Sequence, residues 1–307
     1  MNTLRIGTRG SPLALWQARF VQEQLRLTHA ELQTHLVILE TLGDQIRDRA
    51  LSQIGGDGLF TKEIQNALLG NLVDLGVHSL KDLPTAPVAG LTLGAVPARG
   101  PVGDAFVSNT VARFDKLPPG ARLGTTSLRR RSQAIARRPD LQLVHLRGNI
   151  DTRLNKIETD KLDGIILAEA GLLRLGFQNR IREILDPAWM LPAVGQGALG
   201  LECRDNDLAT LAAIQPLEDS VTRAAVAAER AFLLTLGGGC LIPVGVRTTI
   251  QGNQLQIQGL VLSLDGLEKV AGTMVGDIGE GEKTGAELAR SFLQQGADKI
   301  LQQLRPG

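Results

Sequence analysis

The sequence is poor in several residue types that define whole classes of protein. Its 307 residues include no tyrosine, and phenylalanine and tryptophan bring the aromatic share to only 3%. Two cysteines and four histidines are too few for a disulfide framework and argue against a Cys/His zinc site. No apolar run reaches the roughly 20 residues of a transmembrane helix, and residues 1–10 lack the features of a signal or transit peptide. We therefore expect a cytoplasmic protein without a metal site and without a membrane partner.

Charge of one sign is not in excess either. Lysine and arginine together number 33, aspartate and glutamate number 32, and the formal net charge is +1. Because proteins that bind nucleic acids are usually more basic, we expect no nucleic-acid partner. The hydrophobic share of 43% and the charged share of 21% are typical of a globular protein. At roughly 150 residues per domain, the length allows two or three domains.

The first two thirds of the chain alternate short β-type runs with amphipathic helical stretches, which is typical of an α/β fold with a mostly parallel sheet. Ser11 followed by Pro12 is a helix start signal. Residues 97–103 have the character of a crossing segment, after which the rhythm restarts as a second α/β unit. We expect strands at 73–80, 104–108, 122–126, 141–146 and 164–168, and helices from about 61, 127, 150 and 169.

The pattern changes at about residue 219. An Ala-rich helix over 220–236 ends in three glycines, and one last amphipathic helix closes the chain. Strand-like runs between the two helices indicate a small α+β domain with antiparallel strands. These runs lie at 244–250, 255–262 and 269–275.

Arginine is concentrated between residues 122 and 153, where eight arginines face only two aspartates. This imbalance predicts a strongly positive local field in a nearly neutral chain. A solvated basic face is the alternative interpretation, and it is favoured for three of the eight, which are Arg131, Arg137 and Arg138.

Two strand-to-helix junctions lie within this arginine-rich segment. At the first, Thr125 and Ser127 precede a helix that begins with Leu128-Arg129-Arg130, so hydroxyls, backbone N–H groups and guanidinium groups converge in a way that suits oxyanions. At the second, Arg147 precedes a helix that carries Arg153 in its first turn. Both junctions would lie at the carboxyl ends of strands, where ligands bind in open α/β sheets.

An acidic residue follows directly after a buried-type strand. The run from Val77 to Pro84 ends in the pair Lys81-Asp82, at the rim of the expected cleft. The Asp82 carboxylate could stabilise a developing cation, and at about 4 Å with an effective dielectric constant near 20 that attraction is worth about 4 kcal/mol before desolvation. A turn-capping role is the alternative. His78 is interpreted as a half-buried structural residue.

The two cysteines differ in their surroundings. Cys240 follows three glycines, which leave backbone room around its sulfur that a packed core thiol would not need. Cys203 lies in a strand-like run and is interpreted as a buried small apolar residue. If one thiol is functional, we expect it to be Cys240.

A glycine-rich run at 195–200 satisfies the G-x-G-x-x-G spacing of dinucleotide sites. It leads into Leu201-Glu202-Cys203 without an evident helix, which removes the positive pole that would hold a pyrophosphate. We therefore interpret the run as a tight backbone passage at a domain junction. A nicotinamide oxidoreductase would rest on this weak spacing alone.

Seven motifs in this order resemble the porphobilinogen deaminase family, whose members are also called hydroxymethylbilane synthases. The resemblance covers nearly the whole chain, and the ordered set is highly specific although each motif alone is modest. The motifs are RIGTRGSPLA (5–14), GLFTKE (58–63), VHSLKD (77–82), GTTSLRR (124–130), LRGN (146–149), PAVGQGA (192–198) and GC (239–240).

The resemblance implies a fold of two doubly wound α/β domains of the periplasmic-binding-protein type and a small α+β C-terminal domain. It implies domain 1 at 1–98 and 198–217, domain 2 at 103–192 and domain 3 at 219–307. It further implies a tetrapyrrole-pathway transferase that adds four porphobilinogen units head to tail, with loss of ammonia, to a dipyrromethane cofactor. A thioether to Cys240 would hold this cofactor, and hydrolysis would release the linear product. A monomer is implied, as is a possible hand-over of product to the next enzyme.

The resemblance also implies roles for individual residues. Asp82 would be catalytic and face the pyrrole N–H groups. Arginines suit this chemistry because every pyrrole ring carries an acetate and a propionate. The residues that would bind the cofactor are Lys81, Asp82, Thr125, Ser127, Arg129, Arg130, Arg147 and Arg153. Those that would bind the substrate and the growing chain are Arg9, Ser11, Arg174 and Gln196.

One position departs from the family pattern. Asp57 stands before the glycine of the GLF motif, where the family commonly has lysine, so a lid role for the loop at about 43–58 is an open question. The competing functional hypothesis is a non-catalytic, two-lobed binding protein for a small polyanion. Such a protein would need neither a covalent tether at Cys240 nor a carboxylate at Asp82 in an arginine-lined cleft.

Overall fold

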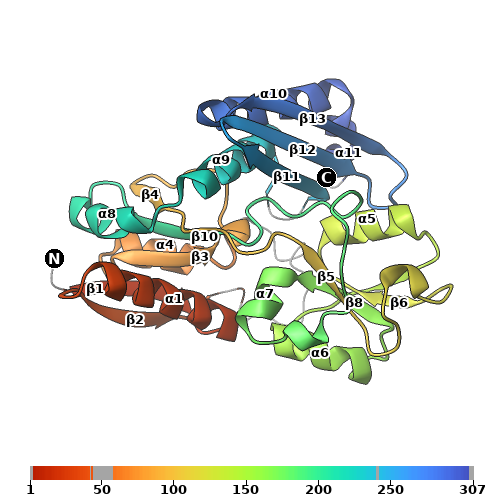
Figure 1. Ribbon diagram of the computed structural model, residues 1–307, viewed down its shortest axis with the longest axis horizontal. Coiled ribbons are helices and arrows are strands. Elements are labelled where there is room, and N and C mark those ends of the chain that lie inside the picture. Colours follow the sequence, from red (N-terminus) through yellow and green to blue (C-terminus); the bar gives the residue numbers. More distant parts are fainter. Residues whose placement is uncertain (1–2, 42, 44–57, 240–241, 304–307) are drawn as a thin grey trace. The chain divides into compact units, whose positions relative to one another are not determined.

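The computed structural model describes residues 3–41, 43, 58–239 and 242–303. They divide into two compact units, each built from two separate stretches of the chain (Figure 1). The first unit comprises residues up to 100 together with 197–223, and the second comprises 101–196 together with the residues from 224 onward. The division into three domains that the sequence suggested stays a prediction.

The first unit contains a five-stranded sheet in the order β2-β1-β3-β10-β4. Strand β1 runs parallel to β2 and β3, whereas β10 runs antiparallel to β3 and β4. The strands are β1 (Thr3–Arg9), β2 (Gln33–Leu39), β3 (Leu75–Ser79), β4 (Leu91–Ala95) and β10 (Leu199–Arg204). The accompanying helices are α1 (Pro12–Thr28), α4 (Lys62–Leu69) and α8 (Leu208–Ile214).

Helix α1 shows how local sequence sets an element that later frames the site. The Ser11 hydroxyl accepts a hydrogen bond from the Ala14 N–H at 3.3 Å, and Pro12 stands at the first helical position, as the sequence predicted. Val21 and Leu25, four residues apart, are fully buried and join the core around β1 and β3.

The second unit contains a five-stranded sheet in the order β7-β6-β8-β5-β9. Strand β6 runs parallel to β7 and β8, and β5 runs antiparallel to β8 and β9. The strands are β5 (Asp104–Val107), β6 (Arg122–Gly124), β7 (Gln142–Val144), β8 (Gly164–Ala168) and β9 (Glu183–Ile184). Its helices are α5 (Leu128–Arg137), α6 (Ile150–Thr159) and α7 (Glu169–Arg174).

The predicted elements and α/β class are confirmed, but the predicted predominance of parallel pairs is wrong. In each five-stranded sheet, two of the four strand pairs are antiparallel. The physical reason is the path of the chain, because strand β10 returns from a distant part of the sequence and inserts between β3 and β4. Hydrophobic periodicity in the sequence gives no information about the order of the strands within a sheet.

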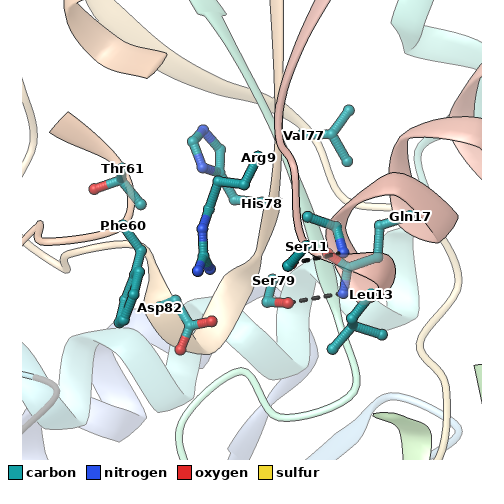
Figure 2. A pocket seen from close by; sticks show the side chains of 11 residues that line it. Arg9, Ser11, Leu13, Gln17, Phe60, Thr61, Val77, His78, Ser79 and Asp82 are labelled. Atoms are coloured by element: carbon teal, nitrogen blue, oxygen red, sulfur yellow. Dashed lines mark hydrogen bonds between the residues drawn. The ribbon is translucent and has the colours of Figure 1, made fainter. Parts of the chain in front are cut away.

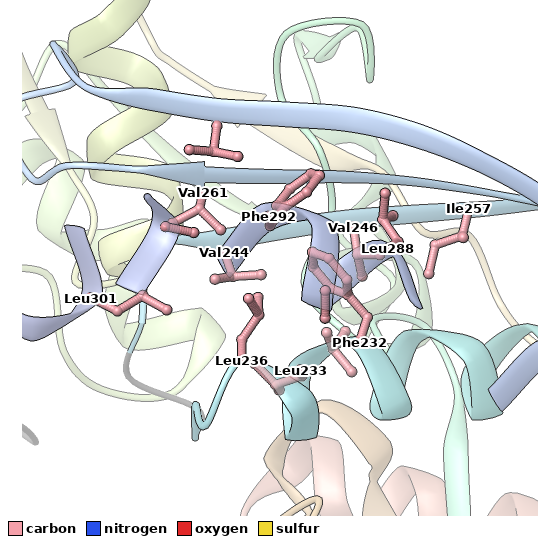
Figure 3. Packing of buried hydrophobic residues seen from close by; sticks show 14 of the residues in the cluster. Phe232, Leu233, Leu236, Val244, Val246, Ile257, Val261, Leu288, Phe292 and Leu301 are labelled. Carbon is pink, nitrogen blue, oxygen red and sulfur yellow. The ribbon is translucent and has the colours of Figure 1, made fainter. Parts of the chain in front are cut away.

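A three-stranded antiparallel sheet also lies in the second unit, and it confirms the predicted α+β character. Its strands are β11 (Val244–Gln251), β12 (Gln254–Leu262) and β13 (Lys269–Asp277), and its helices are α9 (Ser220–Thr235), α10 (Gly281–Gln294) and α11 (Ala297–Gln302). Phe232 and Phe292 pack edge to face in its core, with ring centroids 5.3 Å apart (Figure 3). The single last helix of the sequence prediction is two helices, because Gly296 adopts φ +96° between them.

Candidate functional site

A pocket of the first unit lies where strands β1 and β3 end. Strand β1 ends at Arg9, and strand β3 ends at Ser79 and passes into a single 3-10 turn, Leu80–Asp82. Because β1 and β3 are parallel neighbours, their carboxyl ends share one edge of the sheet. The sheet therefore brings together Arg9, Ser11 and Asp82, which lie far apart in the sequence.

The pocket is a small hollow, lined by charged, polar and apolar side chains together. Figure 2 shows the Arg9 guanidinium between the Phe60 ring and Ser79, pointing toward the Asp82 carboxylate. A cation and an anion thus line one cavity and can bind complementary groups of one ligand. The lining residues are Arg9, Ser11, Leu13, Ala14, Gln17, Phe60, Thr61, Val77, His78, Ser79 and Asp82.

Buried polar residues support the pocket. The Gln17 amide donates a hydrogen bond to the Ser79 hydroxyl at 2.7 Å, which ties helix α1 to the end of β3. His78 Nε2 lies 3.0 Å from Glu202, and the Gln65 amide donates to the same carboxylate at 3.0 Å. His78 is 4% exposed, so it is more deeply buried than predicted, and its pairing with Glu202 agrees with a structural role.

The second unit presents two neighbouring junctions at the carboxyl ends of β6 and β7. The Thr126 hydroxyl donates to the Leu146 carbonyl at 2.6 Å and accepts from the Leu146 N–H at 2.9 Å, which holds the two junctions together. Thr125 and Arg147, which stand next to these residues, are therefore near one another. Thr125 Oγ1 and Arg147 Nη1 are both buried and have no hydrogen-bond partner within the described ranges. Two buried, unsatisfied polar atoms at adjacent junctions are what a bound acceptor would satisfy.

Ser127 and Arg153 lie at the starts of the two helices that follow these junctions. The Ser127 hydroxyl accepts from the Arg130 N–H at 3.5 Å as the N-cap of α5. Arg153 donates from Nε to the Gly148 carbonyl at 2.7 Å. Gly148 has φ +113°, and a Cβ there would lie 2.7 Å from Thr152, so glycine is required for this turn.

Arg129 and Arg130 surround a carboxylate that the sequence analysis missed. Asp104, the first residue of β5, is fully buried; Arg129 Nη1 lies 2.5 Å from its Oδ2, and Arg130 Nη2 lies 2.8 Å from its Oδ1. Arg129 also donates to the Leu191 carbonyl at 2.6 Å. The available signal was a lone aspartate at the start of the apolar run Ala105-Phe106-Val107, in a chain whose arginine cluster has more positive than negative charge.

The charges of this cluster do not cancel, because two guanidinium groups share one carboxylate. Burial by itself raises the pKa of Asp104, but Arg129 and Arg130 outweigh it and hold the pKa far below its usual value. Burial also lowers the pKa of Arg130. Arg129 Nε is buried and has no hydrogen-bond partner in the part of the chain that the structure describes. The cluster therefore retains one positive charge and one free N–H for an anion.

Gln196 belongs to the same cluster. Its amide Nε2 donates to the Val102 carbonyl at 2.7 Å and to Asp104 Oδ1 at 3.0 Å, and its Oε1 lies 3.5 Å from both arginines. The predicted substrate residue Arg174 ends helix α7, and burial lowers its pKa. Gln196 and Arg174 are residues of the second unit. The predicted cofactor residue Lys81 belongs to the first unit, where it lies in the turn that follows β3.

The three arginines interpreted as solvated charges lie on helix α5 and just beyond its end. Arg137 and Arg138 form ion pairs with Asp115 and Asp140 at 3.2 and 2.8 Å, as expected for a basic surface. Arg131 is half-buried, with Nη1 3.5 Å from the Thr125 carbonyl, and burial lowers its pKa. The surface interpretation is confirmed for Arg137, whereas Arg131 and Arg138 are only partly exposed.

The two thiols can be separated only in part. Cys203 is fully buried in β10, and burial raises its pKa to about 11, which confirms it as an inert core residue. Cys240 and Asp57 lie outside the described residues, as does most of the loop at about 43–58. The glycine run at 195–200 leads into strand β10, with Gly195 and Gly197 at positive φ, so the helix of a dinucleotide site is missing and the tight-passage interpretation agrees with the backbone.

Two absences complete the description of the site. Among the described residues, no cluster of three or more His, Cys, Asp or Glu side chains could hold a metal ion. In the same ranges, no helix combines the length and the apolar character that crossing a bilayer requires.

Two family patterns and many relatives match this sequence. The pattern described as "Porphobilinogen deaminase, dipyromethane cofactor binding domain" matches residues 4–212, and "Porphobilinogen deaminase, C-terminal domain" matches residues 223–294. The porphobilinogen deaminase of Syntrophotalea carbinolica is 49% identical over 98% of this chain and 95% of its own. That of Carboxydothermus hydrogenoformans is 48% identical over 98% and 96%. Among solved structures, a nutrient-binding protein from Burkholderia cenocepacia bound to methionine has a TM-score of 0.42 and 12% identity, over 69% of this chain and 91% of that chain.

Proposed function

The chain belongs to the porphobilinogen deaminase family, and from this premise we propose that Asp82 is its catalytic group and Cys240 the point at which its cofactor is attached. The protein is a transferase of tetrapyrrole biosynthesis. It joins four porphobilinogen units head to tail, with loss of ammonia, on a dipyrromethane primer and releases hydroxymethylbilane by hydrolysis. The observation that supports the residue assignment most strongly is the pocket in which Asp82 faces Arg9.

The polar atoms of the second unit fit the dipyrromethane cofactor. This group carries acetate and propionate carboxylates, which need donors. The unsatisfied atoms of Thr125 and Arg147 are buried donors after strand ends, and that of Arg129 is a buried donor on helix α5. When bound, dipyrromethane supplies the pyrrole ring at which chain growth begins. We propose that its carboxylates are held by Lys81, Thr125, Ser127, Arg129, Arg130, Arg147 and Arg153.

In the pocket of the first unit, Asp82 acts on the porphobilinogen molecule. The aminomethyl group reacts in its protonated form: the bond between the methylene carbon and the ammonium nitrogen breaks, and neutral ammonia leaves with the electron pair. The positive charge that remains is delocalised over the methylene carbon and the pyrrole N–H. Asp82 accepts a hydrogen bond from that N–H and stabilises the cation by its own negative charge, a preorganised electrostatic effect that needs no metal.

The proposed substrate residues are Arg9, Ser11, Arg174 and Gln196. Arg9 and Ser11 line the pocket with Asp82, so a carboxylate of porphobilinogen bound by Arg9 places the rest of the molecule within the reach of Asp82. Gln196 contacts both Arg129 and Arg130, so we propose that it acts beside the cofactor carboxylates.

Other parts of the proposal rest on the family resemblance and the composition. They are a cytoplasmic location, a monomeric state, a thioether at Cys240 and a hand-over of product to the next pathway enzyme. Sedimentation of the purified protein tests the monomeric state. The family match does not support a non-catalytic protein that binds a small polyanion.

Intact mass spectrometry tests the cofactor assignment. We expect the purified protein to exceed the mass of its sequence, to lose the excess in Cys240→Ser and to retain it in the matched variant Cys203→Ser. Wild-type protein should consume porphobilinogen, and the excess mass should accompany that activity. Active protein with the mass of the bare chain would overturn the covalent tether.

A further inference from the structure

The ring of Phe60 lies against the guanidinium of Arg9. The Cζ atom of Arg9 is 4.2 Å from the ring centroid, which is well within the range of a cation–π contact. Both side chains line the same pocket as Asp82 (Figure 2). Phe60 thus contacts the very cation to which we assign a carboxylate of the substrate.

The contact with Phe60 bears on how Arg9 binds an anion. It is the last residue of β1, and its long side chain leaves the sheet for the pocket. An arginine side chain loses rotamer entropy when it is fixed, so an arginine that is already held loses less when it binds an anion. A flat aromatic ring that contacts one face of the guanidinium restricts the plane in which the guanidinium lies.

The backbone around Phe60 is built to hold the ring in place. Gly58 has φ +89°, and its carbonyl accepts from the N–H groups of Thr61 and Lys62 at 3.0 Å each, which fixes the turn before helix α4. On another side, a Cβ added to Gly43 would lie 2.2 Å from Cε1 of the Phe60 ring. Only glycine at residue 43 leaves room for the ring where it now stands.

We infer that Phe60 is a positioning residue, which holds the Arg9 guanidinium in the orientation that binds a carboxylate of porphobilinogen. Phe60 acts through Arg9 and takes no part in bond breaking. The inference rests on the proposed function, because it assigns a residue to the same site.

Substrate kinetics of Phe60 variants test this inference. We expect Phe60→Leu, which keeps apolar bulk but removes the π face, to raise KM for porphobilinogen about three- to tenfold with kcat nearly unchanged. Phe60→Trp, which restores a π face, should keep KM within about twofold of wild type. Gly43→Ala should raise KM like Phe60→Leu, because it displaces the ring. The control is Phe20→Leu, which removes another ring of the first unit, stacked on Trp16, and should leave KM unchanged.

A double-mutant cycle separates an action through Arg9 from direct contact with substrate. In an Arg9→Gln background, Phe60→Leu should raise KM no further. An unchanged KM in Phe60→Leu, or a full additional rise in the double variant, would overturn the inference.

A second cycle needs no substrate. The unfolding free energies in urea of wild type, Phe60→Leu, Arg9→Gln and the double variant should be non-additive, and additivity would contradict the contact. If wild type does not consume porphobilinogen, the proposed function fails and this second cycle still decides whether Phe60 holds Arg9.

Discussion

The carboxylate of Asp104 and the guanidinium of Arg129, which lie on different elements, form a fully buried ion pair at 2.5 Å. Arg130 shares the same carboxylate from the next position of helix α5. One aspartate therefore orients two arginines and leaves their combined charge positive. Such a cluster can hold an anionic cofactor only if the aspartate keeps both guanidinium groups in place.

Asp104→Asn should destabilise the protein strongly. It leaves two buried guanidinium groups without a counter-charge, and breaking a buried pair costs about 3–5 kcal/mol. Urea unfolding at neutral pH measures the loss. Asp115→Asn is the matched control, because the Asp115–Arg137 pair is exposed and its loss should change the unfolding free energy by less than about 1 kcal/mol. Equal effects of the two substitutions would refute the role of Asp104.

Asp82→Asn should retain the cofactor mass and lose most turnover. The amide keeps the size of the side chain but removes the negative charge that stabilises the cation left after ammonia departs. At about 4 kcal/mol for such a charge at 4 Å, turnover should fall at least a hundredfold. Steady-state assays with porphobilinogen and intact mass on the same sample check this. Near-normal turnover would remove Asp82 from the mechanism.

Arg129→Leu should give folded protein that carries little or no cofactor, because an anionic carboxylate loses its donor and Asp104 loses one of its two cations. The mass spectrum of the folded fraction, with folding checked by circular dichroism, gives the loaded share. Arg137→Leu on the same helix is the control and should load fully, since Arg137 pairs with the exposed Asp115 and lies over Trp189. A fully loaded Arg129→Leu protein would exclude Arg129 from the cofactor site.

Thiol titration should distinguish the two cysteines. Cys203 is buried, and its pKa of about 11 keeps it protonated at pH 8, so it should not react in the native protein. With Cys240 tied to the cofactor, native protein should show no reactive thiol and unfolded protein should show one. Two reactive thiols after unfolding would mean that Cys240 carries nothing.

Asp74 should contribute stability that depends on pH. Burial raises its pKa, but hydrogen bonds from Arg5 and Arg204 outweigh burial and lower the pKa to about 2, below the 3.8 of an unperturbed aspartate. Its contribution is therefore present above about pH 4 and disappears as the pH falls toward 2. Asp74→Asn should lower the unfolding free energy by about 2 kcal/mol at pH 7, and the difference from wild type should vanish near pH 2. A difference that stays constant over this range would contradict the shift.

Much of the candidate site could be predicted from sequence because its residues follow strand ends. Thr125 and Arg147 come directly after short strand-like runs, and the carboxyl ends of parallel strands share an edge. Asp104 and Phe60 could not be assigned in this way. Asp104 begins an antiparallel strand and meets Arg129 only because β5 lies beside β8, and Phe60 meets Arg9 across 51 positions of the chain.

By itself, the sequence determined the secondary structure of most of the chain, the start of helix α1 at Ser11, the excess of arginine between residues 122 and 153, and the family. These features depend on residue propensities and spacings that act over a few residues, so they can be recognised without knowing the tertiary structure. Only the tertiary structure decided that Arg129 and Arg130 share a buried aspartate, that Arg131 is half-buried and that Arg9 rests on Phe60. Those contacts depend on which strands lie side by side, an order that the chain reaches through long-range packing and that no local pattern records.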